Sequence, residues 1–193
     1  MRGVFYSLSF WQWGCAFLFF WTFGLVAQPV PPGWPPPDKT TELSLKGEDL
    51  DSLPLSLQQY RRLKRLDLSK NELRQLPPWL SEMESLEVIN LRKNPLPQFP
   101  HHLVALPHLR KLILAQTEID SVPACVGRFP ALRYLDLWDS EVAHLHPGIR
   151  AADSLRFLDL RNTYLSTQDL KGLIEDQPLW DIKSTYGCNC GMR

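Results

Sequence analysis

Two aspartates 23 residues apart, Asp136 and Asp159, have the type and spacing that could support chemistry. If they lie on adjacent strands of a sheet, their backbones are about 4.8 Å apart. Two carboxylates so close could serve glycoside hydrolysis or hold a cation. Arg161 lies close enough in sequence to neutralise the pair, however, and nothing nearby implies an enclosing pocket. We therefore predict no catalytic residue, no metal site and no enzymatic activity.

The histidines and cysteines offer no better set. The histidines of interest form two distant pairs: His101 with His102, and His144 with His146. Neither pair is joined by further residues that would complete a tetrahedral ligand set. Cys188-Asn-Cys190 lacks the two-residue gap of redox and zinc motifs. In an oxidising compartment one of these thiols could bridge Cys125 or another chain, or remain free. No cofactor is expected.

The side chains above must be positioned by a 23-residue repeat that runs from Thr41 in six copies without insertion or deletion. Two aliphatic columns define it: Leu43, Leu66, Ile89, Leu112, Leu135, Leu158; and Leu45, Leu68, Leu91, Leu114, Leu137, Leu160. Further apolar columns begin at Leu50, Leu53, Leu57 and Leu63. Because side chains alternate along a strand, both leucines of each L-x-L segment point the same way. Each copy is thus predicted to add one strand to a parallel sheet.

The segment Leu63-Lys-Arg-Leu66-Asp-Leu68-Ser-Lys-Asn71-Glu-Leu73 carries the pattern L-x-x-L-x-L-x-x-N-x-L and resembles the leucine-rich-repeat family. The resemblance covers roughly residues 41–173, and the 23-residue length with L-P-x-x-L is similar to the typical class. It implies a right-handed, curved α/β solenoid. A parallel sheet would line its concave face and short helical or 3₁₀ turns its convex face. The resemblance implies a fold and not a ligand.

The asparagine column of that pattern is incomplete here: Glu48, Asn71, Asn94, Thr117, Ser140, Thr163. A hydroxyl donates one proton where an amide donates two, so Thr and Ser should replace only part of the hydrogen bonding. The later coils are expected to be less tightly bonded to one another. Glu48 suggests that the first coil is an imperfect cap, partly open to water.

The C-terminal end of the array is predicted to be closed by a helix over Ser166–Asp176. Ser166 and Asp169 resemble a capping box. Leu170, Leu173 and Ile174 are spaced for one helical face, which would shield the last coil. Trp180 and Ile182 are expected to complete this cover, although the sequence leaves open whether residues 178–193 pack on the array or hang free.

Residues 1–27 look like a targeting segment, with Arg2 before a long apolar run that ends at Ala27. The segment is either a cleaved signal peptide or, because its length approaches the ~20 residues that span a bilayer, a retained anchor. Both alternatives place the rest of the chain outside the cytoplasm, whether secreted, periplasmic or on the cell surface. Six prolines in residues 29–37 predict a stiff linker over residues 28–40. The repeat domain then spans 41–177 and a tail 178–193.

Function is predicted to reside in the outward side chains of the late strands. Exposed aromatics beside charges are enriched at binding hot spots. The candidate partner-binding residues are Lys111, Ile113, Arg133, Tyr134, Asp136, Trp138, Arg156, Phe157, Asp159 and Arg161. The alternative is that the aromatics only pack against one another along the sheet.

The expected partner is a protein, with a glycan as the other possibility. The 193-residue chain has 21 basic and 21 acidic residues, and this zero net charge weighs against nucleic acid. Membrane contact would come only through an uncleaved leader. Two rival functions stay open: an anchored structural spacer of the envelope, and, disfavoured by length, a fragment of an enzyme.

Overall fold

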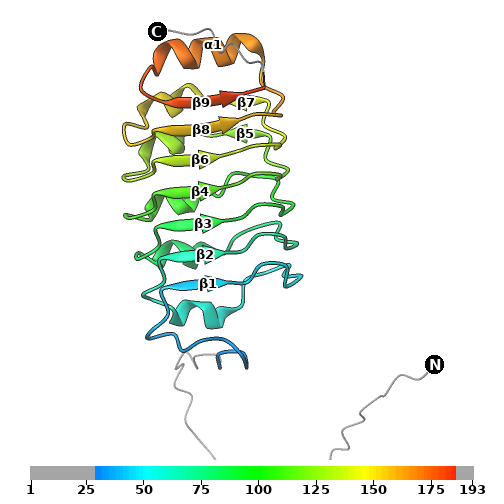
Figure 1. The fold of residues 1–193 in the computed structure, drawn as a ribbon, viewed down its shortest axis with the longest axis vertical. Helices are drawn as coiled ribbons and strands as arrows, with labels where there is room; N and C mark the ends of the chain where they lie inside the picture. The colour runs from blue at the N-terminus through cyan, green and yellow to red at the C-terminus, as the bar shows by residue number, and fades with distance from the viewer. Residues whose placement is uncertain (1–28, 186–193) are drawn as a thin grey trace, which may run out of the picture.

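The computed structural model describes residues 29–185, in which seven parallel strands stack in one ladder (Figure 1). In spatial order these are β1 (Glu42–Ser44), β2 (Arg65–Asp67), β3 (Val88–Asn90), β4 (Lys111–Ile113), β6 (Tyr134–Asp136), β8 (Phe157–Leu160) and β9 (Asp181–Ser184). From β1 to β8 the register pairs residues 23 apart, for example Leu66 with Ile89. The predicted parallel sheet with one strand for each repeat is therefore confirmed.

The opposite side of the stack is made of short 3₁₀ helices. They are η1 (Leu55–Gln59), η2 (Pro78–Glu82), η3 (His101–Ala105), η4 (Ala124–Arg128) and η5 (Pro147–Ala151). Proline precedes the first four, where its fixed φ and missing N–H cost nothing. A small second sheet pairs β5 (Ser121–Val122) with β7 (His144–Leu145). The predicted two-sided architecture, a sheet on one side and 3₁₀ turns on the other, is confirmed.

The core between the two sides contains the aliphatic columns, which are almost wholly buried. It also contains a column that the sequence analysis missed, again at 23-residue spacing: Tyr60, Met83, Leu106, Phe129 and Ala152, all buried. Its members differ too much in size and shape to stand out as a repeat. They end each 3₁₀ helix and fill the space behind it.

Asparagine ties neighbouring coils together in the first half of the stack. Asn71 Nδ2 donates to the carbonyl oxygens of Leu45 and Leu68, both at 2.8 Å, and thus reaches the preceding coil as well as its own. In the later coils Thr117, Ser140 and Thr163 each donate to a carbonyl of their own coil. As predicted, the hydroxyl residues replace only part of the bonding.

The proline-rich segment packs against the first coil. Trp34 meets the ring of Tyr60 edge to face, with centroids 5.9 Å apart, and Tyr60 Oη donates to the carbonyl of Pro35 at 2.8 Å. Thr40 Oγ1 donates to Pro36 O at 2.7 Å. Composition predicted a spacer, but Trp34 supplies enough apolar surface for the segment to cover Tyr60. The first coil was predicted to be partly open to water at Glu48. Glu48 is exposed, but its backbone N–H donates to Asn71 Oδ1 and is therefore bonded to the next coil.

The C-terminal end is covered by helix α1 (Thr167–Asp176), which lies beyond β9 in Figure 1. The Ser166 hydroxyl accepts from the backbone N–H of Asp169, and Leu170 and Leu173 are buried, as predicted. Ile174 is 46% exposed, so its predicted place on the buried face is wrong. Trp180 is buried, and the residues after it form β9, which extends the sheet and was not predicted as a strand.

The predicted leader, residues 1–27, lies outside the described residues, as do Cys188 and Cys190. Among residues 29–185, no helix is long and apolar enough to cross a membrane.

Candidate functional site

The side chains that flank the buried leucines of each strand lie on the opposite side of the sheet from the core and form one surface, which we call the sheet face. The strand register aligns them in columns. The first column reads Glu42, Arg65, Val88, Lys111, Tyr134, Phe157, and the second reads Ser44, Asp67, Asn90, Ile113, Asp136, Asp159. Eight of the ten predicted site residues lie in these columns or just after them. Arg133 and Arg156 instead precede the strands.

Tyr134 and Phe157 stack on the late half of the sheet face. Their ring centroids are 4.3 Å apart and their planes differ by 4°. Lys111 Nζ lies 4.1 Å from the centroid of Tyr134, within the range of a cation–π interaction. Burial raises the pKa of the Tyr134 phenol, and the nearby carboxylates of Asp136 and Asp159 raise it further. The two rings therefore pack as the alternative interpretation expected.

A second cation–π pair joins strands that are not neighbours. Arg92 Cζ lies 5.1 Å from the ring centroid of Trp138, two coils further along the stack. Ala115, at the equivalent position of the intervening coil, is 1% exposed, and its small side chain leaves room for them to meet. Arg92 Nε also donates to Gln116 Oε1 at 2.9 Å. The sequence analysis did not include Arg92 among the site residues. The signal was available, because Arg92 and Trp138 occupy the same position of the repeat two copies apart.

We call Arg92, Lys111, Tyr134, Trp138 and Phe157 the aromatic layer. All three aromatic side chains are half-buried. Aromatic side chains bury large areas with little loss of side-chain entropy, so their edges remain effective contact surfaces. The layer is thus a packed structure in which two cationic side chains lie over half-buried aromatic rings.

The two aspartates are register partners on β6 and β8, as predicted, but their environments differ. Asp159 is 2% exposed and accepts from Arg161 through Nε at 2.9 Å and Nη2 at 2.6 Å. Asp136 Oδ1 accepts the backbone N–H of Trp138 at 3.0 Å. Burial raises the pKa of Asp136, with Asp159 acting in the same direction and the Trp138 N–H, Lys111 and Arg161 opposing it. Both carboxylates are engaged in holding the strand ends.

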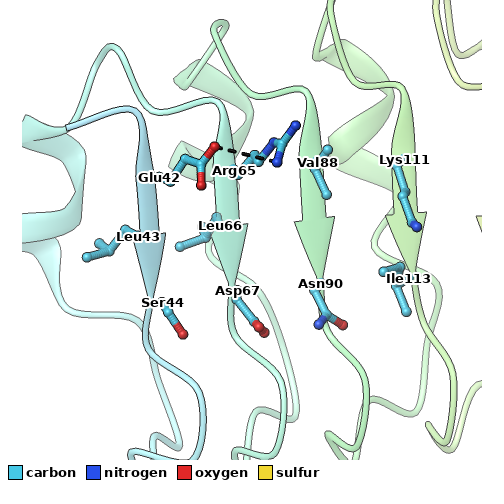
Figure 2. Close-up of a pocket in the computed structure, with 10 residues that line it drawn as sticks. All are labelled: Glu42, Leu43, Ser44, Arg65, Leu66, Asp67, Val88, Asn90, Lys111 and Ile113. Carbon is cyan, nitrogen blue, oxygen red and sulfur yellow. Dashed lines mark ion pairs between the residues drawn. The ribbon is translucent and has the colours of Figure 1, made fainter.

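The early half of the sheet face is hollow. A cavity of about 550 Å³ opens over β1–β4 (Figure 2). Its lining residues are Glu42, Leu43, Ser44, Arg65, Leu66, Asp67, Val88, Asn90, Lys111 and Ile113. Glu42 and Arg65 form an exposed ion pair at 3.5 Å on one side of it. Lys111 and Ile113, both predicted site residues, line the hollow where it meets the aromatic layer. The sequence analysis did not single out the other residues that line the hollow, because none of these residue types is unusual by itself.

The other candidate ligands do not come together. His101 and His102 lie on η3, whereas His146 caps η5 and accepts the Gly148 N–H at 3.0 Å. Burial lowers the pKa of His102. Cys125 is buried in η4, where burial raises the pKa of its thiol. In the part of the chain that the structure describes, no three His, Cys, Asp or Glu residues form a group able to hold a metal ion.

The chain resembles known proteins both in its sequence pattern and in its fold. Residues 61–119 match the family model of the leucine-rich repeat. No curated protein matches the chain in sequence. Among solved structures, the leucine-rich-repeat protein LIC12759 of Leptospira interrogans is 22% identical, over 74% of this chain and 36% of that one, with a TM-score of 0.65.

Two further structures are similar. The plant peptide hormone receptor RGFR1, solved in complex with RGF2, is 22% identical over 75% of this chain and 24% of its own, with a TM-score of 0.59. The leucine-rich-repeat domain of the type III effector XCV3220 (XopL) is 24% identical over 65% of this chain and 43% of its own, with a TM-score of 0.55. This chain therefore matches less than half of each of these chains. Together the repeat match and the shared architecture show that the chain folds as a leucine-rich-repeat solenoid.

Proposed function

We propose that this protein is a non-enzymatic binding module that takes a protein partner on its sheet face, outside the cytoplasm. The observation that carries the proposal is the aromatic layer. Stacking of the coils requires only the inward leucines to be apolar, yet Tyr134, Trp138 and Phe157 gather on the outward side. Large, rigid aromatic side chains and arginine are enriched at protein interfaces and among their binding hot spots.

The hollow over β1–β4 supports the same proposal. It is open and mixed in character, with Val88 and Ile113 beside the charged Arg65 and Asp67. It adjoins the aromatic layer at Lys111, so a partner segment seated in the hollow would meet the aromatic edges next. The engagement of Asp159 by Arg161 supports a non-catalytic role, because this carboxylate is already neutralised.

The structural likeness adds support of a general kind. The fold is shared with RGFR1, a peptide hormone receptor solved with its peptide. Placement outside the cytoplasm is supported by the apolar segment before Ala27. A mature protein whose N-terminus is Gln28 would support cleavage and weigh against the rival role of an anchored spacer.

Site-specific photo-cross-linking tests the proposal. A photoreactive amino acid at Val88, on the face, is compared with one at Glu118, on the exposed turn that follows β4. The proposal expects a partner protein to be captured from the native envelope by the Val88 probe and not by the Glu118 probe. Capture by Glu118 alone would move the site off the sheet face. The absence of any adduct from either probe would favour the spacer.

A further inference from the structure

One edge of the sheet carries a line of arginines, two of which, Arg133 and Arg156, were predicted as partner-binding residues but lie outside the sheet face. Arg110, Arg133 and Arg156 occupy the position just before β4, β6 and β8, and all three are exposed. Their backbones are directly bonded: Arg133 N donates to Arg110 O and Arg156 N donates to Arg133 O, both at 2.9 Å. The three residues thus stand one strand spacing apart, about 4.8 Å, in a straight line along the stack.

The arginines form no close ion pair. Among residues 29–185 no carboxylate lies within ion-pair distance of Arg110, Arg133 or Arg156. Glu87, the preceding member of the column, is held by Lys64 at 2.9 Å, and that hydrogen bond is the main reason that its pKa is lowered, with a smaller contribution from the charge of Arg110. Arg156 Nη1 donates to the carbonyl of Asp153 at 2.7 Å, which holds this guanidinium at the edge.

The basic excess holds for the edge taken as a whole, although the segment before β3 carries only the acidic Glu84 and Glu87. The five segments that precede β2, β3, β4, β6 and β8, residues 61–64, 84–87, 107–110, 130–133 and 153–156, contain six basic and three acidic residues. The five segments that leave these strands, residues 69–73, 92–96, 115–119, 138–142 and 161–165, contain four of each. The zero net charge of the chain therefore conceals a positive edge, which we call the basic rim.

A cleft lies on this rim between the last two coils. It is lined by Arg133, Asp153, Ser154 and Arg156. The Ser154 hydroxyl donates to Pro130 O at 3.0 Å, bridging the coils beside the two guanidinium groups. The rim is therefore polar, and it lacks the apolar centre that a protein interface usually needs.

We propose that the basic rim binds a linear anionic polysaccharide, one that carries carboxylate or sulfate groups along its length. Guanidinium groups bind such oxyanions in two-point contacts. A polysaccharide presents regular charges on an extended, hydrated chain, which matches the evenly spaced, exposed arginines. Single-stranded nucleic acid fits less well, because its bases need open aromatic faces and those of Tyr134 and Phe157 are turned to each other.

Calorimetric titration with a size-defined heparin oligosaccharide tests this proposal on the purified protein. The variant Arg110→Gln, Arg133→Gln, Arg156→Gln removes the rim charges. The matched control Lys70→Gln, Arg74→Gln, Lys93→Gln removes the same charge from exposed residues that follow the strands. Thermal unfolding checks that both are folded, and the single variant Arg133→Gln gives a second measurement, because no hydrogen bond or ion pair of the Arg133 side chain occurs among residues 29–185.

We expect the rim variant to lose affinity about tenfold or more, since three charge-assisted contacts disappear, and Arg133→Gln to lose part of that amount. The control should stay within about twofold, and affinity of the wild type should fall with added salt. Equal loss in both triple variants, or no loss in the rim variant, would overturn the proposal. Polyglutamate or single-stranded DNA binding as tightly as heparin would overturn the choice of polysaccharide. Binding of heparin is independent of the sheet face, so Tyr134→Ala should retain it even if the protein-partner proposal fails.

Discussion

Tyr134 and Phe157 are 23 residues apart in the chain, yet their rings stack with centroids 4.3 Å apart and planes within 4° of parallel. Each ring therefore uses one face to pack on the other, and Lys111 covers the second face of Tyr134. Mutual packing and binding were opposed as explanations of these residues. The geometry shows that the rings pack on each other, and this packing is compatible with binding because it fixes the orientation of the ring edges that face solvent.

The stack should contribute measurably to stability. In a double-mutant cycle of Tyr134→Ala and Phe157→Ala, we expect a coupling free energy of about 0.5–1.5 kcal/mol, the usual range for aromatic pairs. Urea unfolding of the four proteins measures it. Additive effects of the two substitutions would mean that the rings do not interact, and would remove the basis for a preorganised layer.

Asp136 should make stability depend on pH. Its pKa is raised in the folded protein above the ordinary value of 3.8, mainly by burial. The ionised form therefore costs stability, and this cost is absent below pH 3.8 and appears as the pH rises through the folded pKa. Relative to wild type, Asp136→Asn should gain thermal stability at neutral pH and lose this advantage in acid.

Melting temperatures of both proteins from about pH 7 to about pH 3 measure this difference. Asp67→Asn is the control for replacing a carboxylate acceptor by an amide. Asp67 accepts the Ser69 N–H at 2.9 Å, in the same way that Asp136 accepts the Trp138 N–H. A difference between Asp136→Asn and wild type that does not change with pH would contradict the account.

The sequence predicted the sheet, its register and the late aromatic cluster because these depend on residue type at fixed spacing. Leu66 and Ile89 share a column, so their pairing follows from counting. The hollow over β1–β4 could not be predicted in this way, since it arises from the relative lengths of ordinary side chains such as Ser44 and Val88. The packing of Trp34 on Tyr60 was hidden for a different reason: proline composition indicates backbone stiffness but not the partner of one aromatic ring.

The asparagine and hydroxyl positions should differ in their contribution to stability. Asn94 Nδ2 donates to carbonyls of two coils and its Oδ1 accepts the Leu73 N–H at 3.1 Å, so Asn94→Ala would leave several buried groups unpaired. We expect a loss of about 2–3 kcal/mol. Thr117→Val, which removes one bond within a single coil, should cost about 1 kcal/mol. Denaturant unfolding measures both losses. Equal losses of stability in the two variants would show that hydrogen bonding between coils adds nothing to stability.

Close approach of η4 and η5 should make Gly127 intolerant of substitution. A Cβ at this position would lie 2.2 Å from the carbonyl oxygen of Gly148, a backbone atom that cannot rotate away. Gly127→Ala is expected to destabilise the fold by about 1–3 kcal/mol or more. Gly172→Ala is the matched control: its nearest neighbour is Arg150 Nη2 at 3.7 Å, and the change within α1 should stabilise by about 0.5–1 kcal/mol. Thermal unfolding measures the stability of both variants. Equal changes in stability would refute the packing argument.

The most direct test of the proposed function is the affinity for the partner captured at the sheet face. It compares wild type with a folded Tyr134→Ala, Trp138→Ala, Phe157→Ala variant. Tyr164→Ala with Leu179→Ala is the control, since these two residues are 75% and 79% exposed and lie off the sheet face. We predict that the triple variant binds at least about a hundredfold more weakly, as expected for hot-spot aromatics, and that the control binds as wild type does. Unchanged affinity of the triple variant would contradict the account.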